Sequence, residues 1–347
     1  MLQIDREEVL KEILENNYKK VLFQGPDGLR NQLVSLIRYI KKKAFDVDIY
    51  LDGDRSFGAC DIPYGKAARL GAEVIFHFGH TEFRYTTEQY HTLESKIPVK
   101  YFPVYFKGRI SDKVYTELIN RLRKVGSLAV VYSIQYKNQY RDIVGRLQKA
   151  GINIVNYGGP SDDINKWQVI GCDLGYLSKV SNEAEAALVV SSGLFHGLGV
   201  GLYTGLPTLV LDVHKNKIFN IEKEILRFRS LIMYNISSAR DAQSFGVIIS
   251  TKSFQFNHNI AKSINDYINN HLGKYSVIIT LDYIGSEELA YFPSLDAFIQ
   301  TACPRISIDD LISHSKPILN IEQFQIFIGK KRFDEVYPWK EPRLFQD

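Results

Sequence analysis

An α/β protein made of three related βαβ-rich units is the fold class that the sequence predicts. Apolar runs of strand length alternate with segments of helical periodicity, as in proteins with parallel sheets. A cysteine, a strand-like apolar run and a second apolar run after a proline recur together within residues 51–102, 171–211 and 295–321. We therefore expect three tandem homologous domains with parallel sheets in a pseudo-threefold arrangement. Their expected bounds are 1–107, 108–215 and 216–347.

Length and composition agree with several domains. A chain of 347 residues exceeds one ordinary hydrophobic core. With 45% hydrophobic residues, 24% charged residues and a formal charge of +4, the composition is that of a soluble globular protein. Such a small charge predicts no general affinity for nucleic acid or membranes. Residues 1–14 form an acidic amphipathic pattern unlike a signal peptide, so a cytoplasmic location is expected.

One stretch, residues 186–211, carries no Asp, Glu, Lys or Arg and is long enough to span a membrane. It also contains five glycines and a proline, which favour a buried strand, helix and strand in a parallel sheet.

The first unit shows the clearest order of elements. After an N-terminal helix, strands are expected at 18–24 and 47–51 with a helix at 29–43 between them, which makes a parallel βαβ unit. The turn at Gln24 to Gly28 either presents backbone N–H groups to an anion or is a plain tight turn. The second unit repeats this order with runs at 127–132 and 152–156 and a helix at 139–150. The third is expected to start around 230–234 and to continue with runs at 247–250 and 276–281 and a helix at 260–272.

The three cysteines, Cys60, Cys172 and Cys303, fall one in each unit. Their intervals of 112 and 131 residues fit neither a disulfide framework nor the paired spacing of structural zinc. They are either separate reduced core thiols or the ligands of one shared metal site. Their positions in loops and at a strand end favour a shared site, because ligand sites of α/β sheets lie beyond the carboxyl ends of strands. An all-thiolate ligand set favours an iron–sulfur cluster over catalytic zinc.

Several short motifs, taken in order, resemble the archaeal diphthamide-biosynthesis enzymes of the radical S-adenosylmethionine type. The resemblance covers essentially the whole chain. The matching segments are Gln24 to Leu29, Gly53 to Asp61, His77 to His80, Gly171-Cys172, Phe195 to Gly199 and Thr301 to Ile306.

The resemblance implies a specific enzyme. Cys60, Cys172 and Cys303 would hold a 4Fe-4S cluster, and S-adenosylmethionine would be the co-substrate. Its 3-amino-3-carboxypropyl group would be transferred by a radical mechanism to a histidine of translation elongation factor 2, the first step of diphthamide synthesis. Partners implied are elongation factor 2, a second copy of the chain in a homodimer and an external electron donor. No direct nucleic-acid or membrane partner is implied.

Around the cysteines, other residues have two interpretations each. Gly58 and Arg305 are candidates for contacting S-adenosylmethionine, although Arg305 could equally form a salt bridge with Asp309 or Asp310. His80 could orient substrate or be an ordinary strand-end residue. Asp61 and Asp173 are expected to cap the helices that follow them. No catalytic residue is assigned.

Other functions remain open from the sequence alone. A quinolinate synthase-like enzyme also takes one cluster cysteine from each of three domains, but its motifs are not visible here. A non-catalytic iron–sulfur partner subunit and a metal-free triplicated α/β binding protein are the remaining alternatives.

Overall fold

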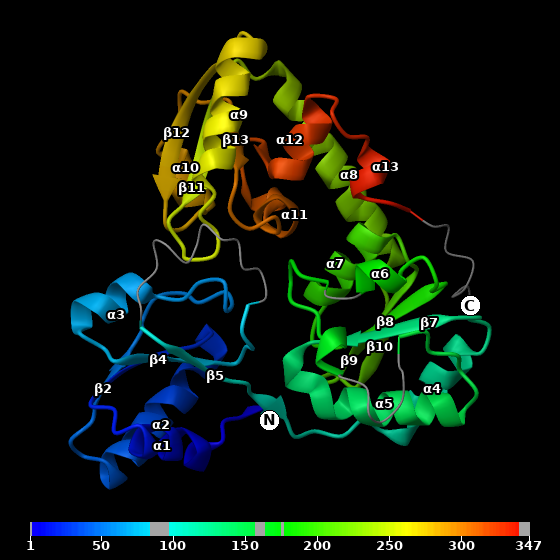
Figure 1. Ribbon diagram of the computed structural model, residues 1–347. Helices are drawn as coiled ribbons and strands as arrows, with labels where there is room; N and C mark the ends of the chain where they lie inside the picture. The colour runs from blue at the N-terminus through cyan, green and yellow to red at the C-terminus, as the bar shows by residue number, and fades with distance from the viewer. Residues whose placement is uncertain (1, 84–96, 157–163, 175–176, 340–347) are drawn as a thin grey trace. The chain divides into compact units, whose positions relative to one another are not determined.

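The structure is a computed structural model that describes residues 2–83, 97–156, 164–174 and 177–339 (Figure 1). Its described residues form three four-stranded sheets and one two-stranded ribbon. They divide into two compact units. The first comprises residues 1–107 and 251–256, and the second comprises 108–250 and 257–347. The predicted α/β class with parallel sheets is confirmed.

The first unit contains one fully parallel sheet in the order β3-β2-β4-β5. Its strands are β2 (Lys20–Gln24), β3 (Asp48–Leu51), β4 (Val74–Phe78) and β5 (Val99–Phe102). The helices are α1 (Arg6–Glu15), α2 (Arg30–Lys43) and α3 (Tyr64–Leu70), with a 3-10 turn at Asp27–Leu29. β1 (Leu2–Gln3) and β6 (Tyr105–Phe106) pair as a short antiparallel ribbon.

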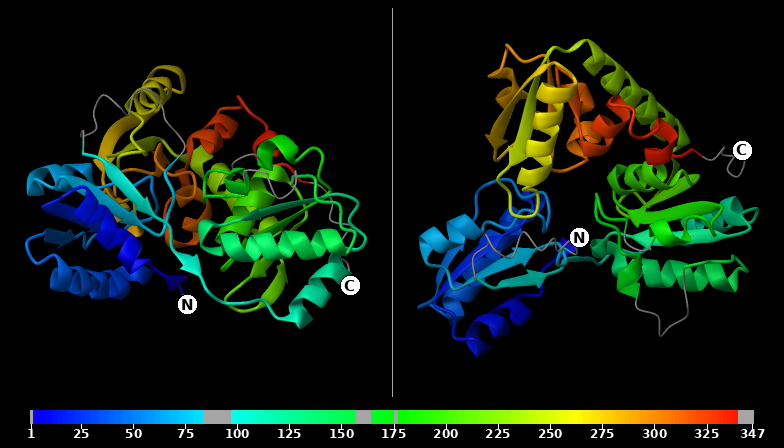
Figure 2. Two further views of the ribbon diagram at one scale, coloured as in Figure 1. Left: turned by 60° about the horizontal axis from the view of Figure 1, so that its bottom comes forward. Right: turned by 45° about the horizontal axis from the view of Figure 1, so that its top comes forward.

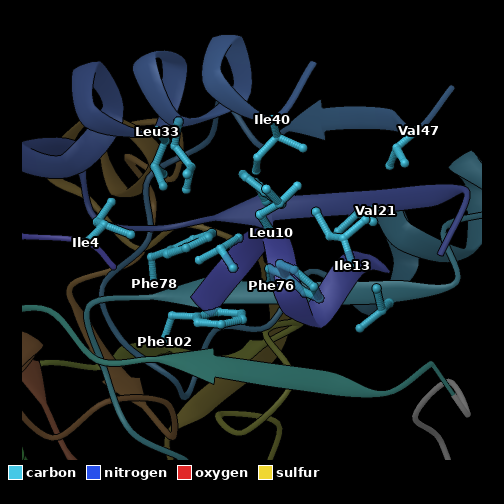
Figure 3. Close-up of a cluster of buried hydrophobic side chains, with 14 of the residues drawn as sticks. Ile4, Leu10, Ile13, Val21, Leu33, Ile40, Val47, Phe76, Phe78 and Phe102 are labelled. Atoms are coloured by element: carbon cyan, nitrogen blue, oxygen red, sulfur yellow. The ribbon is translucent and has the colours of Figure 1, made fainter. Parts of the chain in front are cut away.

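Alternating side chains of these strands fill two cores, one on each face of the sheet. On one face, Phe76 and Phe78 pack with apolar residues of α1 and α2 (Figure 3). Phe23 belongs to the same cluster. On the other face, Leu22 and Ile75 pack with Ala67 of α3 and with Phe254. Phe254 comes from the 251–256 segment, so this piece of chain completes the core of the first unit although its neighbours in sequence belong to the second.

In the second unit, the first sheet has the order β10-β9-β8-β7. Its strands are β7 (Leu128–Tyr132), β8 (Ala186–Ser191), β9 (Thr208–Asp212) and β10 (Lys217–Asn220), of which β10 is antiparallel. Helices here are α4 (Asp112–Leu122), α5 (Lys137–Lys149), α6 (Leu177–Val180) and α7 (Phe195–Thr204), with 3-10 turns at Ile134–Tyr136 and Ile164–Trp167.

The strand expected at 152–156 is reduced to a single parallel bridge between Leu128 and Ile154. The buried amide of Asn156 explains why. Its Oδ1 accepts from the backbone N–H of Val130 and its Nδ2 donates to the carbonyl of the same residue, both at 2.8 Å. A side chain thus makes the hydrogen bonds that a neighbouring backbone would make in a continued ladder.

The second sheet of this unit is fully parallel, in the order β12-β11-β13-β14. Its strands are β11 (Ser244–Ser250), β12 (Tyr275–Leu281), β13 (Ala297–Gln300) and β14 (Ile318–Leu319). Its helices are α9 (His258–His271), α10 (Ser286–Ala290), α11 (Ile306–Asp309), α12 (Ile321–Phe327) and α13 (Phe333–Val336), with 3-10 turns at Ala239–Asp241 and Leu311–Ser313.

A long helix, α8 (Glu222–Ser238), connects the two sheets of the second unit (Figures 1 and 2). It contacts α7 on the side of one sheet and α12 and β14 on the side of the other. The apolar run at 230–234 that was expected to start the third unit lies inside this helix. Its buried residues, including Ile225, Ile232 and Ile236, recur at helical spacing.

Two of the sheets have the same strand order, β3-β2-β4-β5 and β12-β11-β13-β14. In each, the strand that comes second in the sequence of that sheet lies at the edge, and the strand that comes first lies between the second and the third. With the Ile154 bridge counted as a reduced second strand, β7, β8 and β9 follow the same order. In the described part of the chain, no helix is long and apolar enough to cross a membrane; residues 186–211 form β8, α7 and β9 instead.

Candidate metal centre

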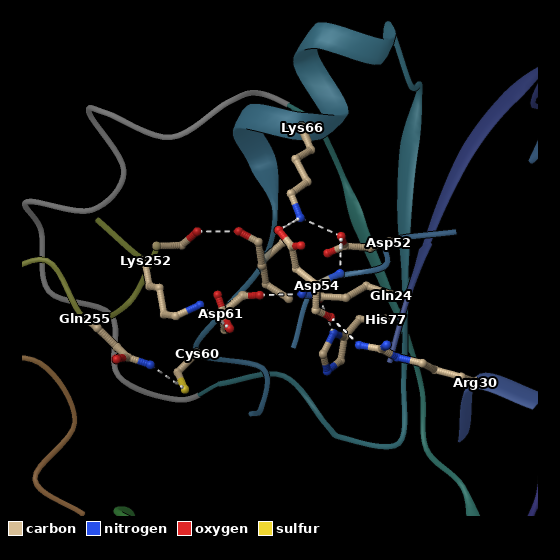
Figure 4. A network of polar contacts seen from close by, with 12 residues as sticks. Gln24, Arg30, Asp52, Asp54, Cys60, Asp61, Lys66, His77, Lys252 and Gln255 are labelled. Atoms are coloured by element: carbon tan, nitrogen blue, oxygen red, sulfur yellow. Dashed lines mark hydrogen bonds and ion pairs between the residues drawn. The ribbon is translucent and has the colours of Figure 1, made fainter. Parts of the chain in front are cut away.

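Cys60 lies in the loop between β3 and α3, in the first unit. It is half-buried, and its sulfur accepts a hydrogen bond from Nε2 of the buried Gln255 at 3.4 Å (Figure 4). Its carbonyl accepts from the backbone N–H of Phe254 at 3.2 Å. Gly58 closes the turn before it, since the Gly58 carbonyl accepts from the N–H of Asp61. The proposed contact of Gly58 with S-adenosylmethionine stays a prediction.

Asp61, directly after Cys60, forms an ion pair with Lys252 at 2.7 Å (Figure 4). Both side chains are nearly buried, with 11% and 12% exposed. The expectation that Asp61 caps the following helix is wrong: the residue before α3 is Pro63, and no side chain caps the helix. The carboxylate is instead used to attach the 251–256 segment to the Cys60 loop.

A series of side-chain hydrogen bonds also leads away from the Cys60 loop. Gln24, at the end of β2, donates from Nε2 to the carbonyl of Asp61 at 2.6 Å. Its Oε1 lies 2.7 Å from Nδ1 of His77, and His77 Nε2 lies 2.9 Å from Nδ1 of His80. Burial, with a smaller contribution from His80, holds the pKa of His77 well below its ordinary value, and burial lowers the pKa of His80 to about 4. Both imidazoles are therefore neutral at pH 7.

Cys172 lies at the tip of a tight turn in the second unit. The backbone groups of Ile170 and Asp173 exchange two hydrogen bonds, at 2.8 and 3.2 Å, which close the turn around Gly171 and Cys172. A Cβ on Gly171 would stand 2.3 Å from the ring of Phe195, so only glycine allows this approach.

Cys303 follows β13, also in the second unit. Gln300 donates from Nε2 to its carbonyl at 2.9 Å, and the N–H of Ile306 donates to the same carbonyl at 3.1 Å. Burial raises the pKa of the Cys303 thiol above its ordinary value. Like Cys60 and Cys172, it is neither fully buried nor in a disulfide.

Arg305 is the buried cation of this region, with 4% of its surface exposed. Its Nε and Nη2 donate to the two carboxylate oxygens of Asp309, so the salt bridge weighed from the sequence is formed. Nη2 also donates to the carbonyl of Phe195 at 2.9 Å and Nη1 to that of Gly171 at 3.4 Å, while the guanidinium lies 4.0 Å from the centre of the Phe195 ring. Arg305 thereby ties the Cys172 turn to the segment after Cys303. Its contact with S-adenosylmethionine stays a prediction.

The donor set fits an iron–sulfur cluster better than other metals. The cysteines lie outside any disulfide, in loops or at a strand end, and cysteine thiolates are the ligands that such clusters take. Within the described ranges no group of three or more His, Cys, Asp or Glu side chains is placed to hold a metal ion. Cys60 belongs to the first compact unit and Cys172 and Cys303 to the second.

Sequence reasoning missed the contacts of Gln24, Lys252 and Gln255. Gln24 stands at a strand end and is the first residue of the turn motif already singled out, which is a usable signal. Lys252 and Gln255 are 191 and 195 residues from their partners, and nothing in the local pattern marks them.

Known proteins resemble this chain over almost its full length. The 2-(3-amino-3-carboxypropyl)histidine synthase of Pyrococcus horikoshii is 28% identical and aligns over 96% of this chain and 94% of its own length. The synthase of the same name from Methanocaldococcus jannaschii is 27% identical and aligns over 97% of this chain and 94% of its own length. A crystal structure of Dph2 from Pyrococcus horikoshii with a 4Fe-4S cluster superposes with a TM-score of 0.81, at 28% identity, and covers 98% of this chain and 96% of that one.

These names confirm the predicted resemblance and the predicted type of enzyme, an aminocarboxypropyl transferase. The family model for diphthamide synthesis proteins matches residues 25–338, which include all three cysteines and Arg305. By that match, the chain belongs to the diphthamide synthesis protein family.

Proposed function

We propose that this protein transfers the 3-amino-3-carboxypropyl group of S-adenosylmethionine to a histidine of translation elongation factor 2 by a radical mechanism. The observation that carries the proposal is the pairing of family membership with three cysteines outside any disulfide, one in each of the recurring chain segments. The structural neighbour that holds a 4Fe-4S cluster supports the same conclusion.

In this proposal Cys60, Cys172 and Cys303 hold one 4Fe-4S cluster. When bound and reduced by the external electron donor, such a cluster would supply the electron for cleaving the sulfonium at the amino-acid arm of S-adenosylmethionine, which requires a potential at the low end of the range of these clusters. A pseudo-threefold arrangement of the three sheets would gather the carboxyl ends of their strands, and with them the cysteines, at one place.

The chain's own residues have supporting tasks. Gln255 and the Asp61–Lys252 ion pair hold the Cys60 loop, and Arg305 holds the Cys172 turn against the segment after Cys303. Such contacts orient metal ligands before the metal binds. We assign Gly58 to S-adenosylmethionine binding, and Arg305 to the methionine carboxylate in addition to its hold on Asp309.

Three single variants, Cys60→Ser, Cys172→Ser and Cys303→Ser, test the ligand set. Each anaerobically reconstituted variant should lose most of its iron and its broad visible absorbance. Phe57→Ser is the matched control, because Phe57 is 59% exposed in the same loop as Cys60; it should keep both. Three variants that each retained a full cluster would rule the assignment out.

Product analysis tests the reaction. The dithionite-reduced protein should convert S-adenosylmethionine to 5′-methylthioadenosine and, when elongation factor 2 is present, label one of its histidines. 5′-Deoxyadenosine as the main nucleoside would contradict the proposed bond cleavage. No cleavage at all would favour a non-catalytic partner subunit or a quinolinate synthase-like activity.

A homodimer, a cytoplasmic location and an external electron donor complete the proposal. Light scattering checks the first of these directly. A dimer has twice the chain mass of 39.8 kDa, and a monomer at micromolar concentration would contradict it.

A further inference from the structure

The chain of hydrogen bonds from Asp61 to His80 determines where every ring proton in it lies. The Gln24 amide nitrogen is committed to the carbonyl of Asp61 at 2.6 Å, and a carbonyl only accepts. The Gln24 oxygen must therefore face His77, so Nδ1 of His77 carries the hydrogen of their 2.7 Å contact. Since His77 is neutral and fully buried, its Nε2 has no hydrogen and must accept.

The same logic passes to His80. Its Nδ1 lies 2.9 Å from the accepting Nε2 of His77, so Nδ1 of His80 carries the hydrogen. Because His80 is also neutral, its Nε2 is an unprotonated acceptor. His80 is half-buried, and among the described residues this nitrogen has no hydrogen-bond partner.

The acceptor is linked by hydrogen bonds to the Cys60 loop of the first unit. It follows β4 at the carboxyl end of the sheet, where α/β proteins bind ligands. Only Gln24 and His77 separate it from the carbonyl of Asp61, the residue after Cys60. A protonated imidazole would repel a positively charged sulfonium substrate, whereas a neutral imidazole does not.

We propose that His80 binds substrate, accepting at Nε2 a hydrogen bond from a nitrogen-bound hydrogen, with Gln24 and His77 as positioning residues that hold it in this tautomer. The donor is either the α-ammonium group of S-adenosylmethionine or the imidazole N–H of the histidine to be modified. This inference rests on the proposed function for the identity of the two donors.

The tautomer is measurable without catalysis. Long-range nitrogen–proton NMR spectra of protein labelled with 15N-histidine should show Nδ1–H, and not Nε2–H, on both His77 and His80 at pH 7. The variants His77→Gln and His80→Gln assign the signals. Gln24→Leu removes the anchoring carbonyl and should produce a mixture of tautomers. A single Nε2–H tautomer or a cationic ring at His80 in the unmodified protein overturns the inference.

Substrate affinity then separates the two donors. His80→Leu removes the acceptor, and His80→Gln retains an acceptor oxygen and should restore part of the loss. The dissociation constant of S-adenosylmethionine is measured by equilibrium dialysis on cluster-loaded protein, and KM for elongation factor 2 from the labelling rate. About a tenfold weakening is expected, the typical effect of losing one hydrogen bond to a charged or buried group.

Weaker S-adenosylmethionine binding in His80→Leu assigns the ammonium as the donor. A raised KM for elongation factor 2 with unchanged S-adenosylmethionine binding assigns the target imidazole. If neither constant moves, the inference fails. Asn156→Ala is the control, because it removes another buried side-chain amide that makes two hydrogen bonds. Asn156 is far in sequence from Gln24, His77 and His80, so this variant should change neither constant.

Failure of the proposed function has a different signature. A cluster-loaded protein that binds S-adenosylmethionine but never cleaves it contradicts the proposed reaction, while the tautomer and the dialysis result still decide the role of His80.

Discussion

At the scale of single residues, the imidazoles of the buried His77 and the half-buried His80 make the stability of this protein sensitive to acid. The pKa of His80 is about 4 in the folded chain and about 6.5 when unfolded. Between these values the unfolded state binds more protons, so the free energy of unfolding falls as the pH drops below 6.5. His77 shifts in the same direction.

We expect His80 alone to remove up to about 2 kcal/mol of stability between pH 7 and pH 5. Urea unfolding of cluster-free protein at a series of pH values measures this slope. His80→Leu should flatten it, whereas His271→Gln, at an exposed position in α9, should leave it unchanged. An equally steep slope in His80→Leu would contradict the assignment.

The Asp61–Lys252 ion pair allows a second test at this scale. Lys252→Met leaves the Asp61 carboxylate nearly buried without its cation, which should cost roughly 3 kcal/mol of unfolding free energy. The double variant Lys252→Met with Asp61→Asn should recover much of that loss, because no buried charge remains. Lys19→Met is the control: its partner Asp46 is half exposed, and little change is expected. Equal losses in the two lysine variants would contradict this account.

At the scale of elements, helix α7 depends on glycine for its packing. A Cβ on Gly201 would stand 2.2 Å from Cδ1 of Ile225 in α8, and one on Gly197 would stand 2.2 Å from Val210 in β9. The glycines that favoured a strand, helix and strand over a membrane span therefore let a helix approach a sheet and another helix closely.

A pair of alanine variants separates packing from helix propensity. Gly201→Ala should destabilise the protein by about 1–3 kcal/mol, because the added methyl overpacks the contact with Ile225. Gly145→Ala, in the middle of α5 with no atom within 4 Å of the new Cβ, should stabilise by about 0.5–1 kcal/mol. Chemical denaturation compares them. Stabilisation by both would mean that α7 is not closely packed.

At the scale of the whole molecule, the cluster should couple the two compact units. If Cys60 of one unit and Cys172 and Cys303 of the other bind one cluster, the loaded protein should unfold in a single transition at higher denaturant. Without the cluster, the units should unfold separately.

Two optical probes distinguish these cases. Both tryptophans, Trp167 and Trp339, belong to the second unit, so their fluorescence reports that unit while far-UV circular dichroism reports both. The two curves should coincide for loaded protein and separate after the cluster is removed. Coincidence in both states, or separation in both, would count against ligands shared between the units.

Local sequence was sufficient for most of the elements. β2, α2 and β3 were predicted almost residue for residue, because strand and helix periodicities depend on nearby side chains. Prediction failed at 152–156, where the amide of Asn156 replaces a ladder, and at 230–234, where an apolar run continues a helix. Both outcomes depend on partners outside the local window.

The sequence by itself determined the α/β class and the family resemblance, because these depend on residue type and spacing. The three homologous domains and the three cysteine ligands stay predictions. Only the tertiary structure decided what surrounds those cysteines. Lys252 and Gln255 reach the Cys60 loop from 191 and 195 residues away, and Arg305 reaches the carbonyl of Gly171 from 134 residues away. Hydrogen bonds and ion pairs act over a few ångströms, so these contacts exist only once packing has placed the chain segments side by side, and no local pattern encodes them.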